Sequence, residues 1–164
     1  GEQGVDPIDI AIELLTSGGA GSIISYNMHS DDLHAFMVQP WTMTSSDGGL
    51  PRFGVAKPHP RSYGSFTRKI RKYVLEDNVV SLEQAIRSMT SLPAAAFRIR
   101  DRGTLRPGAY ADVVVFDLDR IRDRATYTDP HQYSEGVVHV LVNGELALRE
   151  EEMTGSMSGE VLRR

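Results

Sequence analysis

The sequence contains no cysteine, so the chain can form neither a disulfide nor a metal site with thiolate ligands. Long apolar runs are also missing, and no stretch approaches the roughly 18 residues needed to cross a bilayer. The first residues lack the charged start and apolar core of a signal peptide. A net charge of -4 comes without a basic stripe that would follow a phosphate backbone. We therefore expect a cytoplasmic protein that binds neither nucleic acid nor a membrane.

Without thiolates, the chemistry of this chain depends on its carboxylates and five histidines. None of the histidines belongs to an H-x-H or H-E-x-x-H motif, and we assign none to a metal site. His29 and His34 are five residues apart around an expected helix start, which is a poor chelating geometry. His59 lies between prolines as a spacer or hydrogen-bond donor, His131 is interpreted as structural, and His139 alternates with apolar residues in an expected strand.

Helical and strand patterns alternate through the first part of the chain. Asp6 is expected to cap a first helix, residues 21–28 to form a buried strand, and Ser30 to begin a second helix. Residues 41–46 then predict another short strand, which ends just before Asp47. This order is typical of βα units with a parallel sheet, in which active groups gather beyond the carboxyl ends of the strands. Asp47 therefore lies where chemistry is expected.

Three more helices are predicted before residue 100. They begin at Ser62 or Ser65, at Ser81, which has capping-box spacing to Gln84, and at Pro93. The basic residues of the first of these helices are expected to face solvent: Arg68, Lys69, Arg71 and Lys72.

The pattern changes to β-structure near residue 103. We expect a strand and a Pro-Gly turn before the apolar run 113–116, and then a hairpin over residues 137–149 that turns at Asn143-Gly144. Residues after Arg149 have little to bury and are expected to fray. The predicted organisation is thus residues 1–100, residues 101–149 and a flexible tail of residues 150–164.

A loop rich in glycine, proline and basic residues, TSSDGGLPRFGVAKPHPRSYGSF, joins Asp47 to Arg61. An Asp-Gly turn and a proline-rich surface loop are ordinary explanations of such a stretch. Its length for a compact domain favours a functional loop instead.

Several segments together resemble one family: SDGG after a strand, HPRSYGSF, the run Gly103 to Asp117, and PHQYSEG. They are similar to the carboxyl-terminal third of the N-acyl-D-amino-acid deacylases, or D-aminoacylases, of the amidohydrolase superfamily. The run Gly103 to Asp117 specifies only the superfamily, whereas HPRSYGSF and PHQYSEG are typical of the deacylase branch. The resemblance implies the last part of a (β/α)8 barrel, an α/β fold, followed by part of a small β-sandwich.

The resemblance also implies roles for residues of the loop. Asp47 matches an aspartate beside the metal, and we include it in both the metal and the catalytic set. In the family this aspartate takes a proton from a zinc-bound water and returns a proton to the leaving amine. Arg61 matches an arginine that binds a substrate carboxylate, a task suited to its planar fork. Gly48, with Gly49, would let the backbone turn without crowding the site, and we include Gly48 in the substrate-binding set. A metal-free turn and a plain surface arginine are the alternatives.

The family's histidine ligands for zinc find no match in this sequence. The resemblance therefore implies an enzyme that is incomplete in this chain alone and takes the rest of its barrel and most zinc ligands from upstream sequence or a companion chain. Its substrate would be an N-acyl-D-amino acid, hydrolysed to a carboxylate and a D-amino acid. Two alternatives stay open: a cyclic-amide hydrolase of the dihydropyrimidinase and dihydroorotase kind, and a non-catalytic truncated paralogue that acts as a scaffold or partner.

Overall fold

The computed structural model describes residues 4, 6–17 and 27–162, and the chain divides into two units, residues 1–32 and 33–164. The first unit contains helix α1 (Pro7–Thr16), none of whose residues is buried. The carboxylate of Asp6 accepts a hydrogen bond from the Ile8 N–H at 2.8 Å, which confirms the predicted cap. The strand expected at residues 21–28 lies largely outside the described residues. Helix α2 (Ser30–Met37) begins at the residue expected for it.

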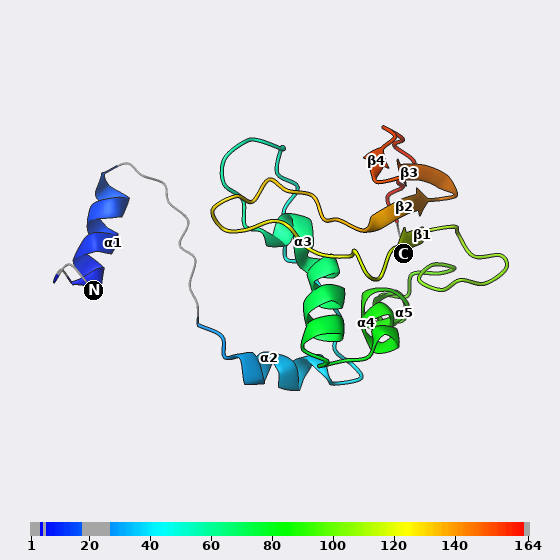
Figure 1. Ribbon diagram of the computed structural model, residues 1–164, viewed down its shortest axis with the longest axis horizontal. Helices are drawn as coiled ribbons and strands as arrows, with labels where there is room; N and C mark the ends of the chain where they lie inside the picture. Colours follow the sequence, from blue (N-terminus) through cyan, green and yellow to red (C-terminus); the bar gives the residue numbers. More distant parts are fainter. Residues whose placement is uncertain (1–3, 5, 18–26, 163–164) are drawn as a thin grey trace. The chain divides into compact units, whose positions relative to one another are not determined.

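Helices make up the first part of the second unit (Figure 1). Helix α3 (Arg61–Arg68) runs directly into the π-helix η1 (Lys69–Glu76), and α4 (Leu82–Met89) and α5 (Ser91–Ala96) follow. Ser81 caps α4 as predicted, because its hydroxyl accepts the Gln84 N–H at 3.2 Å. A small core joins α2, η1 and α4. It is formed by Val74, Val80 and Ala85, with Met37, Leu75, Val79, Leu82 and Met89 packed against them.

The later part of this unit is a four-stranded antiparallel sheet in the order β1-β2-β3-β4. Its strands are β1 (Val113–Phe116), β2 (Val137–Val142), β3 (Glu145–Arg149) and β4 (Glu152–Met153). The hairpin turns at Asn143 and Gly144, whose φ angles of 51° and 85° fit the tight turn that this pair predicts. The predicted run 113–116 and the hairpin are therefore confirmed.

The parallel sheet predicted for the earlier residues is not formed in the part of the chain that the structure describes. Residues 41–46 are not a strand, because their backbone groups find no partner strand; Thr44 alone donates across, to the Ser88 carbonyl at 2.9 Å. Exposure nevertheless alternates along this segment, with every second residue from Thr42 to Gly48 half-buried. The alternation of exposed and half-buried residues that is expected of a strand is thus present, but the hydrogen bonds to a neighbouring strand are not. The strand expected before the turn at Pro107 is also absent.

One further expectation is wrong. Lys69 is not on a solvated face but buried, with 6% of its surface exposed, because its ammonium finds two hydroxyl partners inside. The described residues after Arg149 bury little, as expected, but some of them have partners. Glu152 and Met153 pair with β3, and the side-chain amide of Asn143 donates to the Ser158 carbonyl at 2.6 Å.

Among the helices of the described residues, none combines the length and apolar character that a membrane span requires.

Candidate functional site

Asp47 and Arg61, fourteen residues apart in the chain, are brought together by the loop between them. The Asp47 carboxylate lies 3.1 Å from the Arg61 guanidinium, and the two side chains are 84% and 44% exposed. Asp47 has a φ of 47°, a left-handed conformation that aspartate tolerates better than most residues. An ion pair this open is weak, so both groups stay available to a ligand.

The first turn of α3 is capped by a histidine rather than by a residue at the usual position. Pro60 precedes the helix and offers no side-chain cap, while the His59 Nδ1 accepts the Arg61 N–H at 3.0 Å. Burial lowers the pKa of His59, the positive charge of Arg61 lowers it further, and Asp47 opposes both. His59 thus caps the helix through an accepting Nδ1, and the donor role expected for this residue, which would fall to Nε2, stays a prediction.

Gly48 occupies a place that leaves no room for a side chain. A Cβ built on it would lie 2.9 Å from the Ser62 Cα and 3.1 Å from the Arg61 carbonyl oxygen. A Cβ on Gly49 would meet nothing within 4 Å. Gly48 thus lets the backbone after Asp47 pass against the first turn of α3, and this close approach fixes Asp47 beside Arg61.

A cavity of about 310 Å³ adjoins Arg61 along α3, lined among others by His59, Gly64, Arg68, Asp123 and Tyr127. Arg68 and Asp123 form an ion pair at 3.1 Å across it. A larger cavity of about 780 Å³, near Phe97, Tyr110 and Glu160, contains none of the predicted site residues.

Behind the segment that leads to Asp47, three polar side chains form a buried cluster that the sequence did not reveal. The Lys69 ammonium donates to the Thr44 hydroxyl at 2.6 Å and to the Ser88 hydroxyl at 2.9 Å. No carboxylate in the described part of the chain pairs with it, and burial lowers the pKa of Lys69. The cluster ties residues 41–47 to η1 and α4.

The remaining histidines are dispersed. His29 lies 3.6 Å from the Asp31 carboxylate, the His34 ring meets the Tyr73 ring edge-on, and the His139 Nδ1 accepts the Glu150 N–H at 3.2 Å. Among residues 4, 6–17 and 27–162, no three histidines or carboxylates gather where they could hold a metal ion. Asp47 can offer a single carboxylate to a zinc ion whose other ligands come from elsewhere.

Comparison with known proteins gives one consistent result. The model of the Amidohydrolase family matches residues 27–147. The N-acyl-D-glutamate deacylase of Alcaligenes xylosoxydans xylosoxydans is 42% identical over 161 residues, which is 98% of this chain and 31% of that protein. Dihydroorotases of Lactobacillus species match at 30–34% identity over 54–70% of the chain.

Two solved structures show the same similarity in three dimensions. One is N-acyl-D-glutamate deacylase from Bordetella bronchiseptica, complexed with zinc and a phosphonate mimic of the tetrahedral intermediate, with a TM-score of 0.68 and 48% identity. The match covers 73% of this chain and 25% of that one. The other is D-aminoacylase, with a TM-score of 0.78 and 38% identity over 84% of this chain and 28% of that one.

The chain thus spans about a third of the length of the curated relatives that it matches. The resemblance to the deacylases that SDGG, HPRSYGSF and PHQYSEG predicted is confirmed over nearly the whole length of this chain. On the family match and the two structural matches, this chain belongs to the amidohydrolase family.

Proposed function

We propose that this chain is the carboxyl-terminal part of a zinc-dependent enzyme that hydrolyses N-acyl-D-amino acids. Residues 1–100 contribute the last βα units of a (β/α)8 barrel, and residues 101–149 contribute part of a β-sandwich. The observation that carries the proposal is the exposed pair of Asp47 and Arg61, two residues of different charge that one loop brings to 3.1 Å. Similarity to the zinc-complexed deacylase of Bordetella bronchiseptica supports it.

In this proposal Asp47 moves protons. Its carboxylate accepts a proton from the water that attacks the amide carbonyl and later donates one to the leaving amine, so the amide is split into a carboxylate and a D-amino acid. Zinc, when bound, lowers the pKa of water to about 7 and polarises the carbonyl. The 84% exposure of Asp47 leaves its oxygens free for this role.

Arg61 orients the substrate. Its guanidinium holds the carboxylate of the N-acyl-D-amino acid in place of the weak contact with Asp47, and its planar fork suits a two-point contact. Binding of substrate therefore replaces one partner of Arg61 with another and releases Asp47 for proton transfer.

Additional polypeptide completes the barrel, from upstream sequence or a companion chain. Trp41 and Met43 share the exposed side of residues 41–47 with Asp47 and are 62% and 38% exposed. An apolar surface of this kind beside a catalytic carboxylate suits a neighbouring barrel strand. The part of the chain that the structure describes gathers too few ligands for a catalytic zinc ion, and the chain alone is expected to be inactive.

In the first test, this chain replaces the matching part of the deacylase of Bordetella bronchiseptica, so that a complete enzyme is formed. We expect this complete enzyme, loaded with zinc, to hydrolyse an N-acyl-D-amino acid and to leave the cyclic amide dihydroorotate intact. Hydrolysis of dihydroorotate alone would support the cyclic-amide alternative. A correctly folded, zinc-loaded complete enzyme that hydrolyses neither substrate would support a scaffold.

A second test asks whether Arg61 binds the carboxylate of the substrate. In the complete enzyme, Arg61→Ala should lower kcat/KM by about one to two powers of ten, and Arg61→Lys should restore only part of it. Arg122→Ala is the matched control, because Arg122 pairs with Glu135 and is 45% exposed, close to the 44% of Arg61. The penalty should vanish on a substrate whose carboxylate is a neutral amide. An equal penalty on both substrates would remove carboxylate binding from the proposal.

A further inference from the structure

We propose that His131 is a positioning residue that holds the 51–60 loop, which is part of the chain between Asp47 and Arg61, and thereby places Arg61 for the substrate. What Arg61 binds rests on the proposed function, whereas the contacts of His131 stand on their own. His131 belongs to the 130–136 segment, the PHQYSEG stretch, which is more than 70 residues away in sequence from the loop. Figure 1 shows this segment and the loop beside α3.

Both ring nitrogens of His131 bind the backbone of the loop. The Gly54 N–H donates to Nδ1 at 3.2 Å, and Nε2 lies 2.9 Å from the Ala56 carbonyl oxygen. One side chain thus satisfies a donor and an acceptor of an otherwise exposed loop. Two contacts on residues so close in sequence fix the direction of the loop as well as its position.

The proton arrangement of the ring follows from these partners. Because the Gly54 N–H donates to Nδ1, that nitrogen is an acceptor, and Nε2 carries the hydrogen that the Ala56 carbonyl accepts. The Tyr63 hydroxyl, 2.9 Å from Nδ1, then donates to the same nitrogen. His131 therefore acts as a neutral ring, and a side chain that only donates could not replace it.

Of the two backbone positions that His131 holds, Ala56 is in a conformation that its residue type disfavours. Gly54 and Ala56 have φ angles of 77° and 58°, in the left-handed region. An alanine disfavours this region because its Cβ crowds the following carbonyl. The hydrogen bond from His131 to the Ala56 carbonyl therefore supports a conformation that the loop sequence does not favour.

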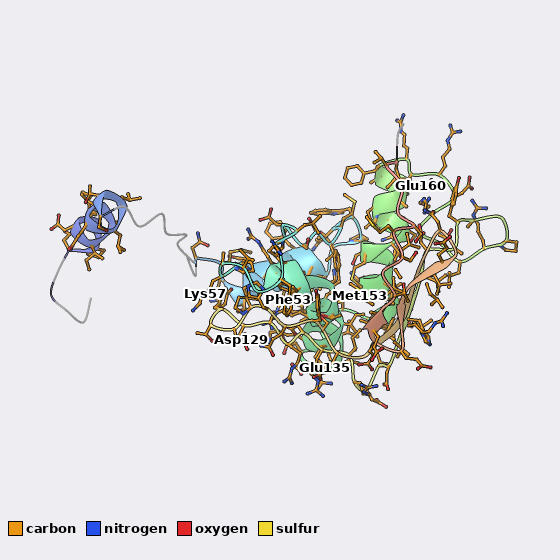
Figure 2. All side chains as sticks on the ribbon, turned by 90° about the horizontal axis from the view of Figure 1, so that it is seen from above. Phe53, Lys57, Asp129, Glu135, Met153 and Glu160 are labelled. Atoms are coloured by element: carbon orange, nitrogen blue, oxygen red, sulfur yellow. The ribbon has the colours of Figure 1, made fainter. Side chains whose placement is uncertain are left out.

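Aromatic packing adds to the hydrogen bonds. The Phe53 ring stacks on Tyr133 with centroids 5.1 Å apart and meets His131 at 5.4 Å and Tyr63 at 6.2 Å. Figure 2 labels Phe53 and Lys57 on the loop and Asp129 just before the 130–136 segment, all at one end of this unit. These ring contacts pack the loop against the 130–136 segment and α3.

The same segment also binds the helix that carries Arg61. Besides the Tyr63 hydroxyl on His131, the Ser134 hydroxyl donates to the Tyr63 carbonyl at 3.1 Å and lies 2.7 Å from the Thr67 hydroxyl. Tyr63 is two residues after Arg61 in the first turn of α3. The 130–136 segment therefore fixes the position of the loop relative to the start of α3. Arg61 lies where the loop and the helix join.

The loop contact can be tested by proteolysis of the folded, complete enzyme. Trypsin can cut after Arg52, within the 51–60 loop, and we expect His131→Phe to speed this cut about tenfold because both backbone contacts are lost while the ring remains. Tyr63→Phe, which removes one hydroxyl, should speed it less and serves if His131→Phe does not fold. His131→Gln, whose amide can both accept and donate, should restore part of the protection. His139→Phe is the control, since it removes a similar contact to the Glu150 N–H elsewhere.

The effect on Arg61 is tested by kinetics. We expect His131→Phe to raise KM for the N-acyl-D-amino acid about tenfold with little change in kcat, and to have no such effect on the neutral amide substrate. Because His131 acts through Arg61, His131→Phe combined with Arg61→Ala should lose no more than Arg61→Ala alone.

Each outcome decides a part of the proposal. Unchanged cleavage after Arg52 in both His131→Phe and Tyr63→Phe would overturn the loop contact. Faster cleavage with penalties that multiply in the double variant would overturn the placement of Arg61. An Arg61→Ala variant without a preference for the acid would refute the proposed role of Arg61 instead, and the cleavage rates would still decide whether His131 holds the loop.

Discussion

Two arginine–aspartate pairs in the second unit differ in how much solvent they meet. Asp47 and Arg61 are 84% and 44% exposed and touch through one contact at 3.1 Å. Asp112 and Arg102, just before β1, are 33% and 11% exposed and share further partners: Asp112 accepts the Asn143 N–H at 2.9 Å, and Arg102 donates to the Asn143 side chain at 2.6 Å.

The Asp112–Arg102 pair is held by several partners, whereas the Asp47–Arg61 pair is held by few. The guanidinium of Arg102 also lies over the Tyr110 ring at 4.1 Å, so its position is fixed from several sides. Asp47 has no such network; only the Ser45 hydroxyl touches its backbone N–H, at 3.4 Å. The same two residue types therefore hold the hairpin in one place and form an exposed pair with few other partners in the other.

The largest effect that should separate the pairs is on turnover. In the complete enzyme, Asp47→Asn should lower kcat by about two to four powers of ten, because the amide cannot accept the proton. Asparagine keeps the left-handed backbone of Asp47, so the change tests chemistry rather than fold. Asp112→Asn should leave kcat unchanged in the fraction that folds. Steady-state kinetics of both variants decide the matter, and full turnover by Asp47→Asn would remove Asp47 from the mechanism.

The next largest effect is on stability, and here Asp112→Asn should have a larger effect than Asp47→Asn. Burial would raise the pKa of Asp112, but the hydrogen bonds from the Asn143 N–H and from Arg102 outweigh it and hold the pKa below its ordinary value. The stabilisation by this carboxylate is therefore present above the pKa of the unfolded chain and is lost as pH falls through the folded pKa. Asp112→Asn should cost about 1.5–3 kcal/mol near neutral pH and weaken the acid dependence.

Denaturant titrations at several pH values measure this difference, with Asp47→Asn as the control. An exposed pair contributes at most about 1 kcal/mol, so Asp47→Asn should change the free energy of unfolding little at any pH. Equal losses of unfolding free energy in the two variants would mean that the Asp47–Arg61 pair stabilises the fold as much as the Asp112–Arg102 pair.

How much could be predicted from the sequence depends on how far apart in the chain the interacting residues lie. Asp6, Ser81 and the Asn143-Gly144 turn act on neighbours a few residues away, and the sequence predicted each of them correctly. Residues 41–46 show the alternating faces of a strand, but a ladder needs a partner that local pattern cannot supply.

Contacts between distant residues escaped prediction in the candidate site as well. Lys69 reads as one more residue of a basic helix face, because its partners Thr44 and Ser88 lie 25 and 19 positions away. His131 was interpreted as structural, but the loop that it binds could not be deduced from spacing. Asp47 was selected by its place after a predicted strand and then by family resemblance, Arg61 by the resemblance, and their roles stay predictions.

A smaller effect concerns the two glycines after Asp47. Gly48→Ala should cost about 1–3 kcal/mol, because its Cβ would press on the backbone of Ser62 and Arg61 at the start of α3. Gly49→Ala, with open space around it, should stay within about 0.5 kcal/mol of the parent. Thermal unfolding of the 164-residue chain compares them. A Gly48→Ala chain as stable as Gly49→Ala would show that the close approach is not kept in solution.

The smallest expected effect is a change in the pKa of His59, which lies beside the Asp47–Arg61 pair. Burial and the positive charge of Arg61 lower the pKa of this imidazole, and the negative charge of Asp47 raises it. Arg61→Ala should therefore raise the pKa of His59 toward its ordinary value, Asp47→Asn should lower it further, and Asp112→Asn should leave it in place. The sign for stability follows: because the folded pKa of His59 lies below the unfolded one, the chain loses stability as pH falls through that interval. Imidazole chemical shifts in an NMR pH titration of the 164-residue chain measure all three variants. Identical His59 titrations in the Arg61→Ala and parent chains would mean that Arg61 does not stay beside His59 in solution, and the contrast between an open and a closed pair would then lose its open member.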